Sequence, residues 1–281
     1  MKKILVTGAT GQLGSELLVL SSNYSQYDWF FADRIQITLD DLEVLEKQLT
    51  SIQPDIIFNC GAYTAVDKAE SEKELAYAVN HLAVELIARY AQQNDVKLIH
   101  ISTDYVFDGT SSVALNEEAE TNPINVYGAS KRAGEVACIN KNPNSIIIRT
   151  SWVYSKFGNN FVKTMQRLMQ ERESLNVVND QTGSPTYAAD LAKAMMDILE
   201  SQKWIPGIYN YSNEGEISWY EFALSIKELG GYTCEVAGIP SASYPTPAKR
   251  PEFSLLNKQK IKTIYNLDVP DYKESLKKIF I

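Results

Sequence analysis

Three polar side chains in the middle of the chain have the types and spacing needed to transfer a proton. Tyr127 precedes Lys131 by one helical turn within the segment 126–135, so the two side chains share a helix face, about 5–6 Å apart at their Cβ atoms. A neighbouring ammonium stabilises a phenolate, so we expect Lys131 to lower the pKa of Tyr127 from its usual value of about 10. Upstream, the apolar run 98–102 reads as a strand ending at Thr103, whose hydroxyl is suited to hold a substrate oxygen. The alternative interpretation is a Tyr and a Lys on an ordinary amphipathic helix.

The N-terminal segment has the order strand, glycine turn, helix. A β-rich run at 2–6 is followed by Gly8, Gly11 and Gly14, and then by a helical pattern at 15–20. Glycines let the backbone turn tightly and approach a pyrophosphate, which the helix N-terminus then faces. The spacing is GxxGxxG and differs from the dinucleotide fingerprint GxGxxG. The turn therefore indicates a dinucleotide site only in combination with the segments downstream of it.

A second predicted strand, 29–32, ends at the place where a nucleotide ribose would be held. Asp33 suits the ribose hydroxyls of NAD, whereas the adjacent Arg34 is suited to receive the 2′-phosphate of NADP. The choice of cofactor therefore stays open on these residues. The alternative for Asp33 is a cap of a helix or turn.

Strands and helices alternate along the first half of the chain. We predict a helix at 40–49, a strand at 55–58, a helix at 72–93, a strand at 97–102, a helix at 127–139 and a strand at 145–149. Such alternation implies right-handed βαβ units and a parallel sheet covered on both faces. The fold class predicted is therefore α/β, a doubly wound parallel sheet of the Rossmann type.

The alternation becomes less regular beyond about residue 150, where we predict a helix at 160–172, a strand at 175–178, a helix at 188–201 and a strand returning to the sheet at 207–211. We accordingly predict a dinucleotide-binding domain at 1–150, rejoined by about 185–212, and a smaller C-terminal domain at 151–281 that mainly binds substrate. The proline-rich segment 242–251 reads as an irregular loop, and its Lys249 and Arg250 are candidates to meet a phosphate. The alternative is solvated surface charge.

The length, composition and net charge of the chain exclude several classes of protein. With 281 residues, 44% apolar content and a formal charge of −8, this is a globular chain without the basic surface that nucleic-acid binding requires. The apolar runs are too short to cross a membrane, and the run at the N-terminus breaks at the glycine turn before a signal peptide forms, so we expect a cytoplasmic protein. Three scattered cysteines and two histidines, His81 and His100, give no metal-ligand spacing, so no metal and no disulfide are expected.

Eight motifs occur in an order that is typical of one family: 8–14, 64–70, 102–109, 127–131, 149–154, 158–161, 179–186 and 244–251. Through them the chain resembles the extended short-chain dehydrogenase/reductase superfamily and, within it, the dTDP-4-dehydrorhamnose reductases. The resemblance spans nearly the whole chain. The first and fourth motifs belong to the superfamily at large, and the others are more specific to these reductases.

The resemblance implies a reaction and a set of roles. Tyr127 matches the proton donor, Lys131 the residue that tunes it and holds the nicotinamide ribose, and Thr103 the hydroxyl that contacts the substrate oxygen. The reaction implied is reduction of the C4 ketone of dTDP-4-dehydro-β-L-rhamnose to dTDP-L-rhamnose, with NADPH favoured and NADH open. Positions matched to or expected at the cofactor are Gly8, Gly11, Gln12, Leu13, Gly14, Asp33, Arg34, Thr38, Leu39, Ala62, Tyr63 and Thr64. Those at the substrate are Thr103, Asp104, Trp152 and Arg250.

The resemblance leaves alternatives open. Trp152 is also readable as a core aromatic, and nothing in the residues separates thymine from uracil. Ala189 stands where some relatives carry an acidic residue for a metal-linked pair, so we expect a monomer or a homodimer without metal. The rival functions are a sugar-nucleotide epimerase or dehydratase, and a non-catalytic nucleotide-binding subunit like one that serves vertebrate methionine adenosyltransferase. Dehydratases usually carry an Asp-Glu pair after the active-site Thr, whereas Tyr105 follows Asp104 here.

Overall fold

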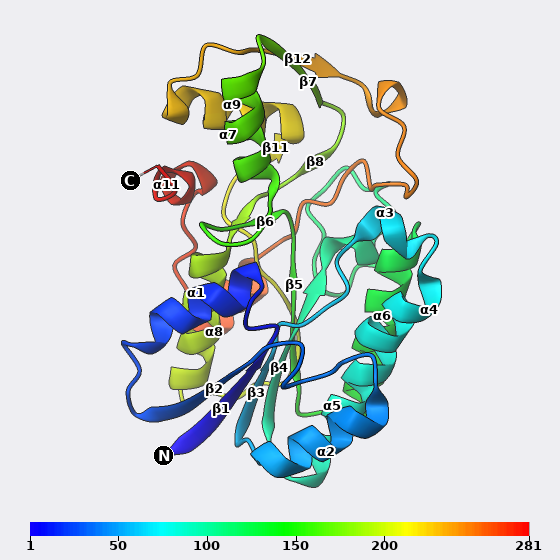
Figure 1. The fold of residues 1–281 in the computed structure, drawn as a ribbon, viewed down its shortest axis with the longest axis vertical. Helices are drawn as coiled ribbons and strands as arrows, with labels where there is room; N and C mark the ends of the chain where they lie inside the picture. Colours follow the sequence, from blue (N-terminus) through cyan, green and yellow to red (C-terminus); the bar gives the residue numbers. More distant parts are fainter. Residues whose placement is uncertain (281) are drawn as a thin grey trace.

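A six-stranded parallel sheet forms the centre of the computed structural model, which describes residues 1–280 (Figure 1). Its strands, in spatial order, are β10 (Gly207–Asn210), β5 (Ile146–Thr150), β4 (Lys97–Thr103), β3 (Ile56–Asn59), β1 (Lys2–Thr7) and β2 (Tyr27–Ala32). Strands β3 and β5 carry only buried side chains and are rich in isoleucine, which is typical of parallel strands that are covered on both faces. The return of the chain to the sheet at 207–211 is confirmed by β10, which pairs with β5.

Helices cover both faces of this sheet, which confirms the doubly wound α/β fold. On one face α1 (Gln12–Ser21) packs beside α8 (Ala188–Glu200). On the other face lie α2 (Leu42–Ile52), α5 (Ala83–Gln93) and α6 (Val126–Lys141). Helix α2 begins where the Asp41 side chain accepts from the Val44 N–H, an N-cap that satisfies one of the free donors of the first turn.

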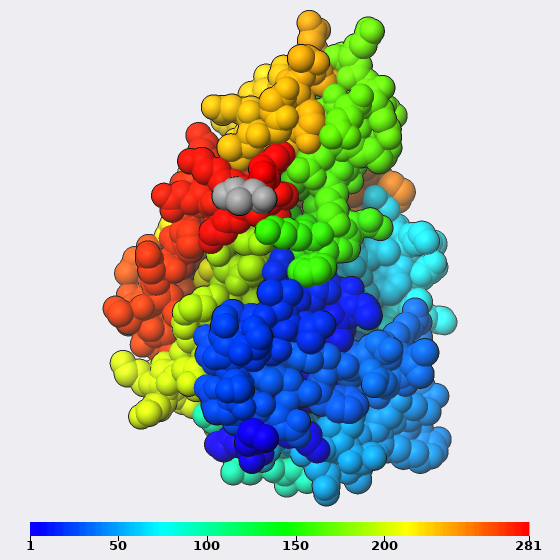
Figure 2. All heavy atoms as spheres, turned by 60° about the vertical axis from the view of Figure 1, so that its left-hand side comes forward, coloured from blue at the N-terminus to red at the C-terminus, as the bar shows by residue number. Residues whose placement is uncertain are grey.

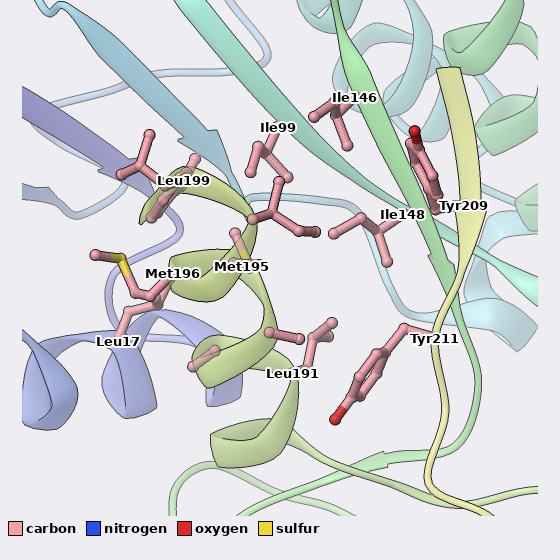
Figure 3. Packing of buried hydrophobic residues seen from close by; sticks show 14 of the residues in the cluster. Leu17, Ile99, Ile146, Ile148, Leu191, Met195, Met196, Leu199, Tyr209 and Tyr211 are labelled. Carbon is pink, nitrogen blue, oxygen red and sulfur yellow. The ribbon is translucent and has the colours of Figure 1, made fainter. Parts of the chain in front are cut away.

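Side chains from distant parts of the chain build the core beneath α1 and α8. Figure 3 shows Leu17 of α1 beside Met196 of α8, with Met195 directed towards Ile99 and Ile148 of the sheet. Tyr209 of β10 belongs to the same cluster. Apart from α1, the segments that close this face follow residue 187 in the chain.

The strand order places a change of winding direction beside β1. Strand β2 lies on one side of β1 and β3 on the other, and both pair with it in parallel. Ligands of open α/β sheets bind outside the carboxyl ends of the strands at such a point. The glycine turn follows β1 directly, so the fold sets it at the expected binding edge.

The remaining residues form a smaller region with a separate core (Figure 2, green and orange at the end opposite the blue N-terminal part). It contains three two-stranded ladders and three helices. The ladders pair β7 (Ser174–Val178) with β12 (Glu235–Ile239), β8 (Thr182–Gly183) with β11 (Ile217–Ser218), and β6 (Val153–Tyr154) with β9 (Thr186–Tyr187). The helices are α7 (Phe161–Glu171), α9 (Trp219–Gly230) and α11 (Tyr272–Lys277). Both α7 and β7 confirm the predictions at 160–172 and 175–178.

The predicted single helix at 72–93 is interrupted, which corrects the sequence prediction. It consists of α4 (Lys73–Tyr77), the π-helix η1 (Ala78–Leu82) and α5. A π turn inserts an extra residue without changing the apolar pattern enough to be read from sequence, and such turns are frequent at functional sites.

Four short elements complete the fold: α3 (Val66–Ala69), the 3-10 turns η2 (Asp104–Val106) and η3 (Ser241–Ser243), and α10 (Gln259–Tyr265). The segment 242–251, predicted as an irregular loop, contains no helix or strand apart from the end of η3 at residues 242–243. No helix within residues 1–280 combines the length and apolar character of a membrane span.

Candidate active site

Helix α6 presents Tyr127 and Lys131 at the carboxyl edge of the sheet. The Asn125 side chain starts the helix by accepting from the Gly128 N–H at 2.7 Å. Tyr127 is 9% exposed and Lys131 only 2%. The Lys131 ammonium donates to the Ile101 carbonyl at 2.7 Å, and burial lowers the pKa of Lys131 to about 8. The predicted pair is thus in place on one helix face, with its charge held in a dry environment.

The pKa of Tyr127 differs from the expectation. Burial raises it to about 12, against a lowering by the hydrogen bond to Thr103, and the negative charge of Asp104 adds to the rise. The predicted lowering by Lys131 is therefore wrong for this structure. The physical reason is that loss of hydration disfavours the phenolate, while the ammonium is directed at the Ile101 carbonyl. A phenol with this pKa is fully protonated at neutral pH and is available as a proton donor.

Thr103 ends β4 and joins Tyr127 to a buried carboxyl group. Its hydroxyl donates to Asp104 Oδ1 at 3.0 Å and accepts from the Tyr105 N–H at 3.2 Å. Burial raises the pKa of Asp104 to about 6, although hydrogen bonds from Ser254 and Thr103 lower it. Asp104 Oδ2 has no hydrogen-bond partner among the residues described. A buried polar atom without a partner is costly, so this oxygen is available to a ligand hydroxyl.

The glycine turn leaves no room for side chains. A Cβ atom on Gly14 would lie 2.4 Å from the Gly8 carbonyl oxygen, and one on Gly8 would lie 2.7 Å from Gly61 Cα. Gly8 also has a φ of +66°, in the left-handed region that favours glycine. Gly11 caps α1 without a side-chain hydrogen bond, and the first turn of α1 has no acidic residue. The free N–H groups of this turn suit a phosphate.

Asp33 caps the turn after β2 and also faces the cavity described below. Its Oδ1 accepts from the Ile35 and Gln36 N–H groups at 2.8 and 2.9 Å, which confirms the cap, and the residue lines the cavity. Contact of Asp33 with a ribose stays a prediction. Arg34 is 79% exposed along its side chain and pairs with Asp40 at 2.8 Å, which leaves most of its guanidinium open to solvent.

Asn80 of the π-helix fixes the turn after β3, and the sequence alone did not reveal it. Its Oδ1 accepts from the Tyr63 N–H at 2.9 Å, and its Nδ2 donates to the Tyr63 carbonyl and to Ser130 Oγ, each at 3.0 Å. Ser130 in turn donates to the Tyr127 carbonyl at 2.7 Å. One buried amide therefore connects a cofactor-side turn to the helix that carries the proton donor. No local sequence signal announces such a role.

These segments surround one cavity of about 860 Å³ at the carboxyl edge of the sheet. Most of the predicted site residues line it: Gly8, Gly11, Gln12, Leu13, Gly14, Asp33, Arg34, Leu39, Ala62, Tyr63, Thr64, Thr103, Asp104, Tyr127, Lys131 and Trp152. Thr38 and Arg250 are not among the lining residues. Gln12 also binds the second half of the chain, because it donates to the Val153 carbonyl at 3.2 Å and accepts from Asn160 at 2.9 Å.

Arg250 has a protein partner. Both terminal nitrogens of its guanidinium bind Asp67, at 3.1 and 2.8 Å, and this pairing lowers the pKa of Asp67. The neighbouring Lys249 carbonyl accepts from Asn125 at 2.7 Å. The loop that carries both cations is thereby tied to the start of α6, and contact of Arg250 with a phosphate stays a prediction.

Side chains of the types that bind metal ions form no cluster within the described residues. Residues 1–280 contain no group of three or more His, Cys, Asp or Glu side chains suited to a metal ion. His100 is fully buried in β4 with Nδ1 3.0 Å from Asn59 Nδ2. Burial keeps its pKa well below the usual value, so His100 is neutral.

Comparisons with known proteins agree over the full length. A family profile described as RmlD substrate binding domain matches residues 1–281. The chain is 40% identical to a dTDP-4-dehydrorhamnose reductase of Escherichia coli (strain K12), covering 98% of this chain and 96% of that protein. It is 41% identical to the enzyme of the same description in Sinorhizobium fredii, over 99% and 96% of the two chains.

A solved structure gives the same result in three dimensions. The dTDP-4-dehydrorhamnose reductase of Bacillus anthracis str. Ames, in complex with NADP, superposes with a TM-score of 0.95 at 38% identity and covers 100% of this chain and 99% of its own. Identity at this level over the entire length is well above what a shared fold alone produces. The chain therefore belongs to the dTDP-4-dehydrorhamnose reductase (RmlD) family.

Proposed function

We propose that the protein reduces the C4 ketone of dTDP-4-dehydro-β-L-rhamnose with NADPH and releases dTDP-L-rhamnose. The observation that carries this proposal is the convergence of the glycine turn, Thr103, Tyr127 and Lys131 on one cavity. The relatives that share the whole length of the chain are named for this activity. The site has to support the assignment because the same fold serves many reactions.

The residues at the end of the cavity formed by the glycine turn fit a dinucleotide. Gly8 and Gly14 leave the backbone bare where a Cβ would collide with its neighbours, and α1 begins with free N–H groups. NADPH, when bound, supplies the hydride for the ketone carbon. Arg34, which is largely exposed, is the residue we assign to the 2′-phosphate, and Asp33 is assigned to the ribose. NADP is present in the related Bacillus anthracis structure.

The chain itself supplies the proton. Tyr127, protonated at neutral pH because its pKa is about 12, donates to the oxygen of the forming alkoxide, which is a much stronger base. The O–H bond of the phenol breaks as the new O–H bond forms. We assign to the Lys131 ammonium, one helical turn away, a partial stabilisation of the phenolate that is too small to bring the pKa of Tyr127 below its usual value. Thr103 holds the same substrate oxygen. Donors placed where charge develops act mainly on the transition state and so raise kcat.

The proposal extends to substrate binding and domain roles. Asp104 and Trp152 line the cavity, and we assign them to the sugar. Residues 1–150, with the return at about 185–212, form the dinucleotide-binding domain, and the rest of 151–281 mainly binds the sugar nucleotide. Because reduction requires a supply of reduced nicotinamide, we infer a cytoplasmic protein. A monomer or homodimer is expected, and light scattering in solution will decide between them.

A coupled assay tests the function directly. The substrate is produced in situ from dTDP-glucose by the two preceding enzymes, and loss of the absorbance of reduced nicotinamide is followed with NADPH and NADH in parallel. Substrate-dependent loss, faster with NADPH, is the expected result. Protein that binds NADPH but oxidises neither cofactor would refute the proposal and favour a different sugar nucleotide or a non-catalytic role.

A further inference from the structure

Trp152 occupies a backbone conformation that a large side chain rarely adopts. It lies on the cavity wall with a φ of +47°, in the left-handed region, where bulky residues are outliers. Such strain persists only where neighbouring contacts over-determine the conformation, and it gathers at ligand sites. Here the Trp152 carbonyl accepts from the Thr186 N–H at 3.2 Å, and Ser151 Oγ donates to the Ser184 carbonyl at 2.6 Å.

Trp219 holds the face of the Trp152 indole. The two rings are stacked with centroids 3.7 Å apart and planes 14° from parallel. Trp219 is the first residue of α9 and follows a capping box in which Ser218 and Glu221 bind each other's backbone N–H groups. Phe161 supports the other side of the cluster, 4.6 Å from the Trp219 ring. The position of Trp219 is therefore fixed by its own helix.

Gly183 holds the edge of the same indole. A Cβ atom on Gly183 would lie 3.0 Å from both Cε2 and Cζ2 of Trp152, so a methyl group there would displace the indole edge by a few tenths of an ångström. Gly183 belongs to β8, and it pairs with Ile217 of β11, the strand that leads into Trp219. One short ladder therefore supplies both contacts that orient Trp152.

We propose that Trp219 is a positioning residue that sets the orientation of Trp152 and thereby the affinity of the site for the sugar nucleotide. This inference rests on the proposed function, because it assigns Trp152 to the sugar. Trp219 is not among the residues that line the cavity within 1–280, so it acts through Trp152. An indole held flat against a rigid partner offers a pre-formed apolar wall to a sugar ring, and pre-organisation lowers the cost of binding.

The orientation is not a requirement of packing alone. Backbone strain of this kind gathers at ligand sites and is uncommon for a tryptophan that only fills a core. Both indoles pack against the core of the smaller region, but of the two it is the strained residue, Trp152, that also lines the cavity. The glycine that makes room for the indole lies on the same ladder.

Two substitutions of Trp219, to Leu and to Phe, test the proposal, and Trp204→Phe is the matched control. Trp204 is a tryptophan outside this cluster, donating to the Asn144 carbonyl at 2.7 Å just before β10 begins, at the amino ends of the strands. Stacked indoles give a paired signal, an exciton couplet, in circular dichroism through their strong far-ultraviolet transitions. We expect Trp219→Leu and Trp219→Phe to abolish that signal and Trp204→Phe to keep it.

Kinetics separate positioning from simple loss of stability. We expect Trp219→Leu to raise KM for the sugar nucleotide about tenfold, with a smaller change in kcat and an unchanged Kd for NADPH. Trp219→Phe keeps an aromatic face and is expected to restore most of the affinity. A second route to the same displacement, Gly183→Ala, is expected to raise KM in the same direction, because its methyl group pushes the indole edge.

Several results would overturn the inference. Absence of the paired signal in the unaltered protein would show that the two indoles are not stacked, whether or not the protein is active. An unchanged KM in an active Trp219→Leu variant would show that the stack does not affect binding of the sugar nucleotide. A loss of NADPH affinity as large as the loss of sugar-nucleotide affinity would show that Trp219 has a merely structural role. Failure of the proposed function looks different, since the unaltered protein would then bind NADPH and show the stacked signal without consuming the substrate.

Discussion

The two ends of the cavity are built in different ways. At the nucleotide end, Gly8, Gly11 and Gly14 lie within one turn, and bare backbone decides the shape. At the reaction end, Thr103 and Tyr127 come from different elements and depend on side chains for their position. The first end is thus a local property of a few adjacent residues, whereas the second exists only once distant segments have packed. Substitutions should therefore act on binding at one end and on chemistry at the other.

Tyr127→Phe is expected to give the largest effect and to act on chemistry alone. Removal of the phenol proton should lower kcat by about a hundredfold or more, while Kd for NADPH stays the same because the glycine turn is untouched. Steady-state kinetics and a fluorescence titration with NADPH measure the two quantities. Unchanged turnover would show that Tyr127 is not the proton donor.

Gly14→Ala should produce the opposite pattern. The added methyl would lie 2.4 Å from the Gly8 carbonyl oxygen and 2.7 Å from Ala9 Cα. We expect Kd for NADPH to rise about tenfold or more, and the free energy of unfolding to fall by about 1–3 kcal/mol.

Gly11→Ala is the comparison variant, because its Cβ meets the same oxygen at 3.1 Å and should cost less stability. Chemical denaturation and NADPH titration of both variants check the order. Equal stability of the two would mean that the turn relaxes freely, and the contrast between the ends would be lost.

The charge of Lys131 should set a basic limb in the pH profile of kcat. A lysine with a lowered pKa loses its proton at a lower pH than usual, so the ammonium is present below about 8 and is lost above it. We expect kcat to fall by about tenfold between pH 7 and pH 9. Stopped-flow rates with saturating cofactor measure the limb. The profile of Lys131→Met should be flat in this range and lower throughout; a limb that persists in this variant belongs to another group.

The pair formed by Asp67 and Arg250 should give the smallest effect. The side chains are 40% and 23% exposed, so solvent screens them, and we expect a coupling free energy of about 1 kcal/mol in a double-mutant cycle of alanine variants. If the pair only ties the loop to α3, both single variants should change KM alike. A rise in KM confined to Arg250→Ala would instead support the predicted phosphate contact.

The sequence predicted most of what is local. The glycine turn, the Tyr127–Lys131 spacing and the strand ending at Thr103 could be recognised because each depends on neighbours along the chain. The binding edge of the sheet followed from the alternation of strands and helices. The fold class and family could be predicted for the same reason.

What escaped prediction depends on contacts between distant segments or on burial. Asn80 acts through a π turn that leaves no mark on the apolar pattern. The stack of Trp152 on Trp219 joins residues from separate elements. The predicted lowering of the Tyr127 pKa was wrong. Spacing along the chain reveals a nearby charge but not how much water burial removes, and here the loss of hydration is the larger effect.

The late arrival of α8 and β10 has a consequence for synthesis on the ribosome. Strands β1 to β5 emerge first, yet the apolar face beneath α1 is closed by Met195, Met196 and Tyr209, which follow the excursion through 151–187. A nascent chain that has reached only residue 187 therefore exposes a wide hydrophobic surface, the kind of surface that recruits chaperones and promotes aggregation. The interruption of the sheet by the smaller region thus sets the interval during which the growing polypeptide is most vulnerable.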